Sequence, residues 1–553
     1  MKPIRPSLYI LILLMFLFFN RQVQGQTPKF LIPADSLIVD GDFAPYNTIQ
    51  PGDTVFLQSG TRANLLLRDF FGNQDHPIVF INYGGRVTIN TDFNYGIAIA
   101  NCKFVHLTGT GDQDTVYGID IQHVGNGAGV IISELSSDFE VDHIRIENVH
   151  TAGITAKTEP DCLFTSTRNN FTQFNTLIHD NYILTTGNEG ITAGSWFYNG
   201  KSITCDGRDT VLYPSILSGV RVYNNTVTSA GWAGIQVNSA SVDCRIYNNT
   251  VTNDSQAGDS VNISGIYLGP GTKSDCYNNT ISEGQGNGIE DHGLGGNRLF
   301  NNLIVDAGRT YFPGDLTKKR HGILVNDVST QPDSSFRILF NDIINPKCDG
   351  VRFESVISRN NFIVSNVIIN PGDYVLEGMP SYIEIEDPAS EVTISNNYLR
   401  LDTINAGFIN GTYVQKAGSP LIDAGYYQGE GVTFDYTDNP RPIGAGFDIG
   451  IYEFNLETTG IQPIATASDA FRAYPNPARV KMNLDYELLS ASDVILDIYN
   501  LEGEKLLTKV QTAVPAGNHV ISQDIVALSS GIYMFRLRTG SKVITGKFIK
   551  TLN

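Results

Sequence analysis

One short phrase recurs along this chain at a nearly constant spacing. RVYNNTV at residues 221–227 returns as RIYNNTV at residues 245–251. A repeat of about 23 residues cannot bury an apolar face alone, whereas stacked repeats bury a continuous one. The chain is therefore expected to stack its repeats into an elongated array. Weaker copies of the phrase place an anchor at Asn148, Asn181, Asn279, Asn302, Asp342, Asn366 and Asn397.

A second phrase lies between these anchors. It is a Gly followed by a short alternating strand, as in AGIQVN and SGIYLG. Each unit thus offers three short strands: one after the Gly, a second such as VRVY, and a third after the Asn turn. The pattern predicts an all-β chain built as a parallel β-helix. The anchor Asn side chains are expected to stack as a ladder, each amide bonding to the turn of the next coil.

The N-terminus and the composition indicate an exported protein. Lys2 and Arg5 precede an apolar run over residues 8–19, which is typical of a secretory signal peptide. No later stretch is apolar for the roughly 18 residues that a transmembrane helix needs, so the mature chain is expected to lack one. Lys and Arg number 38 against 57 Asp and Glu, a net charge of −19 that disfavours nucleic acid as a partner.

Residues 40–400 resemble the right-handed parallel β-helix proteins of the pectin-lyase-like superfamily. The resemblance rests on the GI and NN phrases and on PGDTVFLQSG at residues 51–60, which is similar to the start of such helices in polysaccharide lyases. SPLIDAG at residues 419–425 is similar to their closing piece. The resemblance implies the fold, and only by analogy an activity on polysaccharides.

The C-terminal segment has a different composition. AYPNPARVKMNLDYELL and GIYMFRLRTGSKVITGKFIK resemble the type IX secretion sorting domain of Bacteroidetes, a small β-sandwich. This resemblance implies that the type IX secretion machinery exports the chain, which is then secreted or held at the outer cell surface. The expected domains are a signal peptide at 1–25, an N-terminal cap and first coils at 26–100, the β-helix at 101–400, a closing segment at 401–460, a linker at 461–472 and the sorting domain at 473–553.

Insertions build up both edges of the first strands. Residues 157–171 and 194–215 lengthen the early turns on one edge, and later loops lengthen the turns on the opposite edge. Cys162 and Cys205 lie in the two early insertions and are expected to form a disulfide. Loops on both edges predict a groove along the first strands, and an elongated groove suits an extracellular polysaccharide.

Strand alternation predicts which side chains line that groove. When each Ile points inward, the next residue points outward, and so does the residue two positions further on. The first outward column contains Asp120, Thr155, Thr192, Gln236, Tyr267, Glu290, Leu324 and Arg352. The second contains Gln122, Lys157, Gly194, Asn238, Gly269, His292, Asn326 and Glu354.

One cluster in these columns suits catalysis, and two reactions remain open. A polysaccharide lyase needs a cation and a base. The loop LTKKRH places Lys318, Lys319, Arg320 and His321 beside the columns. Arg352 or the loop residues Lys318, Lys319 and Arg320 would supply the charge, and His292 or Tyr267 would be the base. A glycoside hydrolase needs two carboxylates, for which Glu290 is the first choice. The second carboxylate is Glu354 or Asp291, and Asp291 falls at an inward phase.

The remaining candidates concern binding. Trp196 and Trp232 either stack on sugars or pack within loops, and Trp196, inside an insertion, is the better candidate for stacking on sugars. The competing hypothesis is a non-enzymatic surface adhesin or structural protein, in which Glu290 and His292 are solvated groups on an exposed strand. No closely spaced His and Cys set suggests a zinc site, while the acidic GTGDQD at residues 109–114 admits calcium as a cofactor. The other predicted substrate-binding residues are Tyr267, Gln236, Asn238, Lys157, Asn326 and Glu354.

Overall fold

The computed structural model covers the helix, its closing segment and most of the C-terminal domain. The expected signal peptide and linker lie outside the described residues. The structure describes residues 29–112, 115–258, 263–313, 315, 317–372, 381–409, 412–426, 431–455, 473–474, 478–488, 492–500, 505–529, 531–539 and 542–550.

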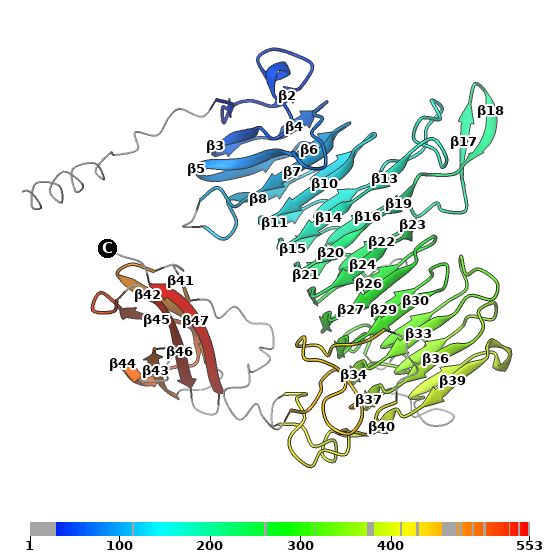
Figure 1. The fold of residues 1–553 in the computed structure, drawn as a ribbon, viewed down its shortest axis with the longest axis vertical. Coiled ribbons are helices and arrows are strands. Elements are labelled where there is room, and N and C mark those ends of the chain that lie inside the picture. The colour runs from blue at the N-terminus through cyan, green and yellow to red at the C-terminus, as the bar shows by residue number, and fades with distance from the viewer. Residues whose placement is uncertain are drawn as a thin grey trace, which may run out of the picture.

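The body of the chain is a parallel β-helix with three strands per coil, and successive coils lie side by side in chain order (Figure 1). The first strands form one 12-stranded parallel sheet, here called the first-strand sheet. Its strands are β2 (Ile38–Asp40), β4 (Leu65–Arg68), β6 (Tyr95–Ala100), β9 (Ala128–Ser133), β12 (Ile154–Ala156), β16 (Ile191–Ala193), β22 (Ile235–Val237), β26 (Ser264–Leu268), β29 (Asn287–Asp291), β32 (Ile323–Val325), β35 (Val351–Phe353) and β38 (Ile383–Ile385).

The second and third strands form two further parallel ladders. The second strands are β7 (Lys103–Thr108), β10 (Ser137–Asp142), β14 (Thr176–His179), β20 (Arg221–Tyr223), β24 (Cys244–Tyr247), β27 (Ser274–Tyr277), β30 (Asn297–Phe300), β33 (Phe336–Leu339), β36 (Asn361–Val364) and β39 (Val392–Ser395). The third strands are β8 (Ile119–Val124), β11 (Ile144–Val149), β15 (Tyr182–Thr186), β21 (Thr226–Ala230), β25 (Thr250–Thr252), β28 (Thr280–Ser282), β31 (Leu303–Val305), β34 (Asp342–Ile344), β37 (Val367–Ile369) and β40 (Tyr398–Arg400).

In the first coils the second-strand and third-strand ladders are joined, because one long strand takes part in both. Strand β5 (Ile78–Thr91) pairs with β7 through its first half and with β8 through its second half. Strand β3 (Thr54–Arg62) lies between β5 and β1 (Leu31–Ile32). Two short 3-10 helices, η1 (Tyr46–Thr48) and η2 (Pro388–Ser390), lie near the two ends of the helix.

Stacked Ile and Val side chains fill the interior of the helix as one continuous core. This packing leaves no room for a side chain at the first position of the repeated GI phrase, so the residue there must be Gly. A Cβ on Gly288 would lie 2.4 Å from the Ile304 side chain and 2.5 Å from the Gly322 carbonyl oxygen. A Cβ on Gly322 would lie equally close to Ile343 and to the Gly350 carbonyl oxygen. The same collision at successive coils explains why this residue recurs.

The predicted Asn ladder is confirmed, with two corrections. The backbone N–H of Asn225 donates to Oδ1 of Asn249 at 3.0 Å, and the N–H of Asn249 donates to Oδ1 of Asn279 at 3.1 Å. Asn148 is not a member of the ladder, because the N–H of Ile144 bonds to Asn181 in that coil. Asp342 was also a wrong prediction, since its neighbour Asn341 occupies the ladder position. The connected members are Asn181, Asn225, Asn249, Asn279, Asn302, Asn341, Asn366 and Asn397.

We expect Asn249→Ala to lower the free energy of unfolding by about 3 kcal/mol. The Asn249 amide donates to the Val222 and Tyr247 carbonyl oxygens and accepts from Asn225, and each buried group left without a partner costs about 1–3 kcal/mol. Urea unfolding followed by circular dichroism measures this loss. The matched control is the first Asn of the same pair, Asn248, which is exposed at φ 56°.

Asn248→Gly should change stability by less than about 0.5 kcal/mol, because Gly adopts a positive φ freely and no buried bond is lost. Equal losses in both variants would contradict a specific role for the inner Asn.

The early insertions form a separate layer at the edge of the first-strand sheet. Cys162 and Cys205 form the expected disulfide, and the four remaining cysteines are buried. The insertions contain an antiparallel hairpin of β17 (Lys201–Cys205) and β18 (Arg208–Leu212). They also contribute to a small parallel sheet of β13 (Thr172–Phe174), β19 (Ile216–Ser218) and β23 (Ala240–Val242).

The C-terminal domain is antiparallel, as expected for a small β-sandwich. Buried Met482, Ile498, Leu537 and Phe548 belong to its core. One sheet contains β41 (Ala473–Tyr474), β42 (Lys481–Leu488) and β45 (Gly517–Asp524), and the other contains β43 (Ser492–Tyr499), β44 (Lys505–Val514), β46 (Gly531–Thr539) and β47 (Lys542–Lys550). Within the described part of the chain, no helix has the length and apolar character needed to span a membrane.

Candidate functional site

The register of the first-strand sheet confirms most of the predicted outward columns. Glu290 on β29 pairs with Tyr267 on β26 and with Leu324 on β32, which in turn pairs with Arg352 on β35. The second column continues the same ladder just beyond the strands. There the N–H of His292 donates to the Leu268 carbonyl oxygen at 2.7 Å.

The placement of Asp120 and Gln122 in these columns was wrong. Both residues lie on β8, which belongs to the third-strand ladder and pairs with β5 and β11. The first strand of that coil is β9, where Ile131 pairs with Thr155. The phrase YGIDIQ has the same alternation as a true first strand, so its position in the coil is not visible from the pattern alone.

Glu290 and His292 form a hydrogen-bonded pair on the outward face. Oε1 of Glu290 lies 2.8 Å from Nε2 of His292, and both side chains are 13% exposed. Nδ2 of Asn287 donates to the other Glu290 oxygen at 2.7 Å. The Tyr267 ring lies 5.2 Å from the His292 ring, and burial raises the pKa of Tyr267. Tyr267 is thus a neutral side chain that lies beside the pair.

Arg352 is surrounded by carboxylates. Its Nε donates to Glu354 at 2.7 Å, and its guanidinium lies 3.2 Å from Glu386 and 3.6 Å from Asp349. Burial alone would raise the pKa of Glu354, but hydrogen bonds from Arg352 and Asn326 hold it below its usual value. Glu354 is therefore an ionised carboxylate at neutral pH, and the Arg352 charge is already balanced.

The inward position expected for Asp291 is confirmed. Its side chain is fully buried, and one carboxylate oxygen accepts from the N–H of Gly293 at 2.9 Å and from Asn297 at 2.7 Å. Burial raises the pKa of Asp291 to about 6. Asp291 thus faces the core and is removed from the outward face where Glu290 lies.

Asn287 and Asp349 join this face without having been predicted, beside His321, which the sequence had placed there through its loop. Each of the three precedes the Gly of a GI phrase. The Asn287 side chain contacts Glu290, and the Asp349 side chain contacts Arg352. Asn287 accepts from the His321 N–H at 2.7 Å, and Nδ1 of His321 lies 3.0 Å from the Asp349 carboxylate. Alternation does not predict these positions, because the backbone bends at the Gly. In the sequence they are recognisable only as a polar residue that recurs immediately before GI.

The two amides predicted to bind substrate lie deeper than expected. Gln236 and Asn238 are 3% and 1% exposed. Oε1 of Gln236, Oδ1 of Asn238 and Nδ1 of His292 are buried and have no hydrogen-bond partner within the described part of the chain. A bound ligand or an ordered water would satisfy such buried polar atoms.

An insertion loop reaches across the edge of the sheet towards these columns. Nδ2 of Asn199 donates to the Val328 carbonyl oxygen at 3.4 Å, and the Tyr198 ring packs on Gly271. Oγ of Ser329, next to Val328, donates to the His292 carbonyl oxygen at 2.6 Å. The same loop carries Trp196, which is 44% exposed.

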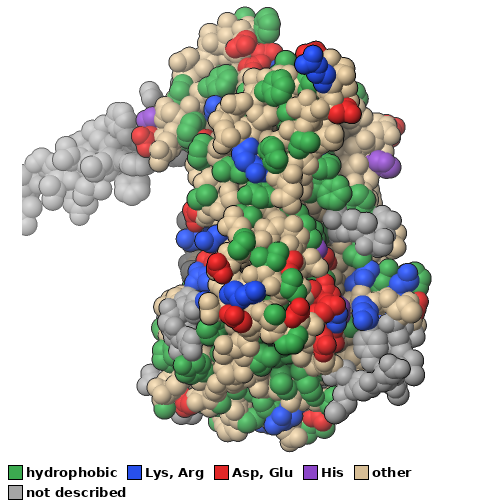
Figure 2. All heavy atoms as spheres, turned by 90° about the vertical axis from the view of Figure 1, so that its right-hand side faces the viewer, with side chains coloured by type: hydrophobic (Ala, Val, Ile, Leu, Met, Phe, Trp, Pro, Cys, Tyr) green, Lys and Arg blue, Asp and Glu red, His purple; other side chains and the backbone are tan. Residues whose placement is uncertain are grey.

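The basic side chains predicted to lie near Glu290 and His292 are not all found there. Lys157 pairs with Glu159 at 3.2 Å, and Lys319 is exposed, without a described contact to Glu290 or His292. Arg320 lies instead within electrostatic reach of Glu290, with its guanidinium 4.0 Å from the centre of the Tyr311 ring. Acidic and basic side chains lie together in the lower half of the face shown in Figure 2.

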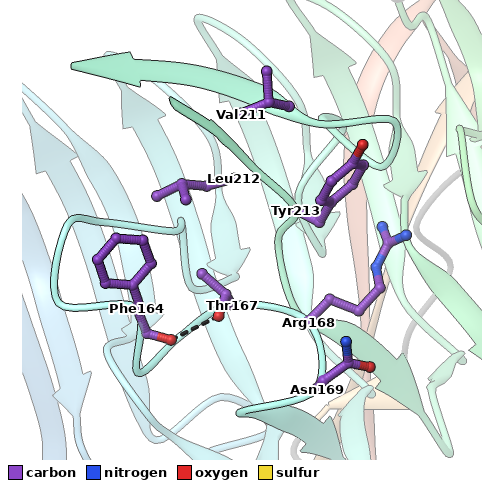
Figure 3. Close-up of a pocket in the computed structure, with 7 residues that line it drawn as sticks. All are labelled: Phe164, Thr167, Arg168, Asn169, Val211, Leu212 and Tyr213. Atoms are coloured by element: carbon purple, nitrogen blue, oxygen red, sulfur yellow. Dashed lines mark hydrogen bonds between the residues drawn. The ribbon is translucent and has the colours of Figure 1, made fainter. Parts of the chain in front are cut away.

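A hollow of about 340 Å³ lies within the insertions and not between the outward columns (Figure 3). Arg168, one of its lining residues, stacks on Tyr198 at 4.1 Å and approaches Tyr213 at 5.3 Å. The calcium hypothesis for residues 109–114 falls partly outside the described residues, because residues 113–114 are among those not described. The other residues that line the hollow are Phe164, Thr167, Asn169, Val211, Leu212 and Tyr213.

This architecture defines a secreted solenoid with a separate export domain, and family models agree. Residues 214–400 match the right handed beta helix region, and residues 472–551 match the secretion system C-terminal sorting domain. The chain is therefore a right-handed parallel β-helix protein with a C-terminal type IX secretion sorting domain. Such a sorting domain marks proteins that are secreted or held at the outer cell surface. The search of curated proteins found no match.

Several solved structures match this chain at low sequence identity. XylC in complex with xylose is 10% identical with a TM-score of 0.37, covering 73% of this chain and 94% of its own. The periplasmic alginate epimerase AlgG is 12% identical with a TM-score of 0.38, covering 67% and 85%. Tailspike protein 2 of an Escherichia coli bacteriophage is 11% identical with a TM-score of 0.33, covering 90% and 64%.

Proposed function

We propose that the protein is a glycoside hydrolase that binds a neutral extracellular polysaccharide along the first-strand sheet. One observation carries the proposal: Glu290 is held by His292 and Asn287 on an outward face that also presents Glu354. Two carboxylates beside a bound glycan are the basic requirement for glycoside hydrolysis.

The two carboxylates lie in neighbouring outward columns. Glu290 lies on β29, and Glu354 follows β35, two strands along the same parallel sheet. Neighbouring strands lie about 4.8 Å apart, and Glu354 is displaced by two further residues along the strand direction, so the two backbones are about 12 Å apart. Inverting hydrolases place their carboxyl groups about 6.5–9.5 Å apart, so the two side chains would converge on the sugar from the two columns. Asp291 does not compete for this role, since it is buried and bonded inward.

The electrostatics favour a neutral glycan over a uronate polymer. A lyase must neutralise the uronate carboxylate with a cation. Arg352 already contacts three carboxylates, and Lys319 makes no described contact with Glu290 or His292. Arg320 lies within electrostatic reach of Glu290, but its guanidinium is stacked on the Tyr311 ring. A polymer of uronates would therefore meet mostly negative charge along β35 and β38, whereas sugar hydroxyls would find hydrogen-bond acceptors.

The test is to incubate the full chain with neutral polysaccharides (xylan, mannan and α- and β-glucans) and with uronate polymers (alginate, pectin and chondroitin). We expect new reducing ends from one neutral polysaccharide and no ultraviolet absorbance from unsaturated products. Absorbance on a uronate polymer would instead establish a lyase.

Failure to release products from any polymer would leave the non-enzymatic surface protein as the function. Affinity electrophoresis against the same panel then distinguishes a glycan-binding protein from one that does not bind glycans. In the binding case, retardation by a glycan should be lost in Trp196→Ala, because Trp196 is exposed on the loop at the sheet edge.

A further inference from the structure

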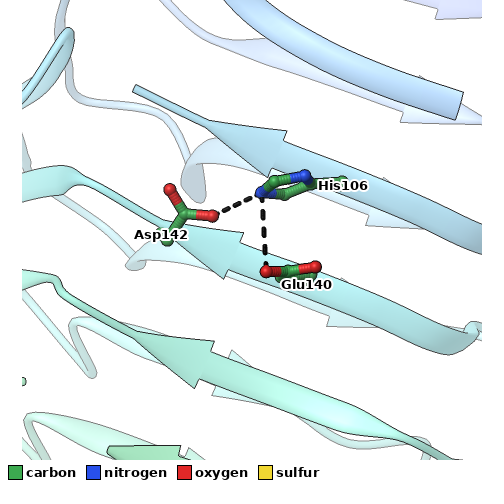
Figure 4. Close-up of side chains that lie close together, drawn as sticks. All are labelled: His106, Glu140 and Asp142. Atoms are coloured by element: carbon green, nitrogen blue, oxygen red, sulfur yellow. Dashed lines mark hydrogen bonds and ion pairs between the residues drawn. The ribbon is translucent and has the colours of Figure 1, made fainter. Parts of the chain in front are cut away.

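Two histidines and two carboxylates converge on the second-strand ladder, away from the first-strand sheet. His106 lies on β7, Glu140 and Asp142 on β10, and His179 on β14. The register places His106 beside Glu140 and Asp142 beside His179. Alternate residues of a strand share a face, so all four side chains emerge on the same side of three successive coils. Figure 4 shows His106 pointing between Glu140 and Asp142.

Ligand atoms of His106, Glu140 and Asp142 lie within 4.8 Å of one another, and His179 adjoins two of these residues. Nε2 of His106 contacts Oδ2 of Asp142 and lies 3.9 Å from Oε1 of Glu140. Nε2 of His179 lies 2.9 Å from the same Glu140 oxygen and 4.0 Å from the same Asp142 oxygen. Bonds of about 2.0–2.1 Å in a tetrahedral zinc site place neighbouring ligand atoms about 3.3 Å apart. The four separations lie on both sides of this value, so the side chains would have to adjust around the ion to form a tetrahedron.

The surrounding contacts orient these ligands as they would in a metal site. Nδ1 of His179 hydrogen-bonds to Asp180 at 2.7 Å, so Nε2 of the same ring, which faces Glu140 at 2.9 Å, is the nitrogen that would bind a cation. The ring is also fixed by stacking on Tyr223 at 4.5 Å. Oδ1 of Asp142, the oxygen not directed at the cluster, is bonded to His143 and Thr108, each at 2.6 Å.

We propose that His106, Glu140, Asp142 and His179 bind one Zn²⁺ ion that joins three successive coils. Two imidazoles and two carboxylates suit zinc, whereas calcium prefers oxygen ligands alone. Four protein ligands close the coordination sphere, so the ion stabilises the helix and leaves no open position for substrate. The site thus goes beyond the proposed hydrolysis and is independent of Glu290.

The test uses the full chain, stripped with a chelator and titrated with Zn²⁺ by calorimetry. We expect one ion per chain, a higher unfolding temperature with Zn²⁺, and no response to Ca²⁺. Co²⁺ added in place of Zn²⁺ should give the strong visible absorbance of tetrahedral coordination. Failure of the wild-type chain to bind Zn²⁺ at one equivalent, or a weak octahedral Co²⁺ spectrum, would overturn the assignment.

Variants separate this site from other histidines. His106→Ala should abolish stoichiometric binding, and Asp180→Asn should weaken it about 10–100-fold by removing the charge that orients His179. His123→Ala is the matched control and should bind like the wild type, because His123 lies on the neighbouring ladder with its side chain 43% exposed. Zinc binding that survives in His106→Ala would overturn the proposal. Asp180→Asn keeps the test valid if His106→Ala does not fold.

Discussion

Glu290→Gln is expected to lower the turnover of a hydrolysed polysaccharide by about 10²–10⁴-fold, the usual contribution of a positioned proton-transfer group. Gln keeps the size of the side chain and can still accept one hydrogen bond from Asn287 or His292. It cannot gain or lose a proton in the working pH range. The loss should therefore fall on kcat, with KM changed only slightly, because the change removes an interaction of the transition state.

The matched control is Glu391→Gln. Glu391 is exposed and pairs loosely with Arg359 at 3.8 Å, outside the outward columns. This variant should retain full turnover and the same unfolding temperature. Reducing-end release by Glu290→Gln within about twofold of the wild type would contradict an acid–base role. Glu354→Gln offers an independent check, since both carboxylates are required by the proposed reaction.

The repeat made the coil and its columns predictable from sequence. A fixed spacing of Gly, Ile and Asn determines which residues face the core, so Tyr267, Glu290 and Arg352 were placed on one face correctly. The error at Asp120 arose because a third strand has the same alternation as a first strand. The sequence also did not predict how deeply each side chain is buried. Gln236 occupies an outward position in its strand, yet it is only 3% exposed.

The histidine and carboxylate cluster illustrates what a local motif search misses. His106 and Asp142 are 36 residues apart, and His179 and Glu140 are 39 apart. Zinc motifs are usually recognised by ligands a few residues apart, whereas a β-helix brings together residues that are one coil apart. Because insertions make the coil length irregular, the sequence did not predict this meeting, and the strand register was needed to find it.

The closing segment contains a buried ion pair whose loss should be among the largest stability effects in the protein. Arg441 and Glu453 are both 0% exposed, and their charged atoms lie 2.8 Å apart. Arg441 also donates to the Gly450 carbonyl oxygen at 2.7 Å, and its guanidinium lies over the Phe340 ring of the helix. It therefore connects the closing segment to the last coils.

We expect Arg441→Met to lower the free energy of unfolding by about 3–5 kcal/mol, because Glu453 is left as a buried charge without its partner. Burial already raises the pKa of Glu453 to about 7 in the intact pair, and removing Arg441 raises it further. The folded variant then binds more protons than the unfolded chain above a pH of about 4.3, the ordinary pKa of Glu. Its stability should therefore fall as pH rises from about 4.3 through 7 and beyond.

Urea unfolding between pH 5 and pH 8 measures this dependence, and Arg441→Met combined with Glu453→Gln is the matched comparison. The double variant should lose the additional pH dependence, because no buried carboxyl remains at position 453. Part of the deficit should persist at every pH, since the Gly450 carbonyl oxygen still lacks its donor. A loss below about 1 kcal/mol, as for an exposed ion pair, would show that the closing segment does not depend on Arg441 for its attachment to the helix.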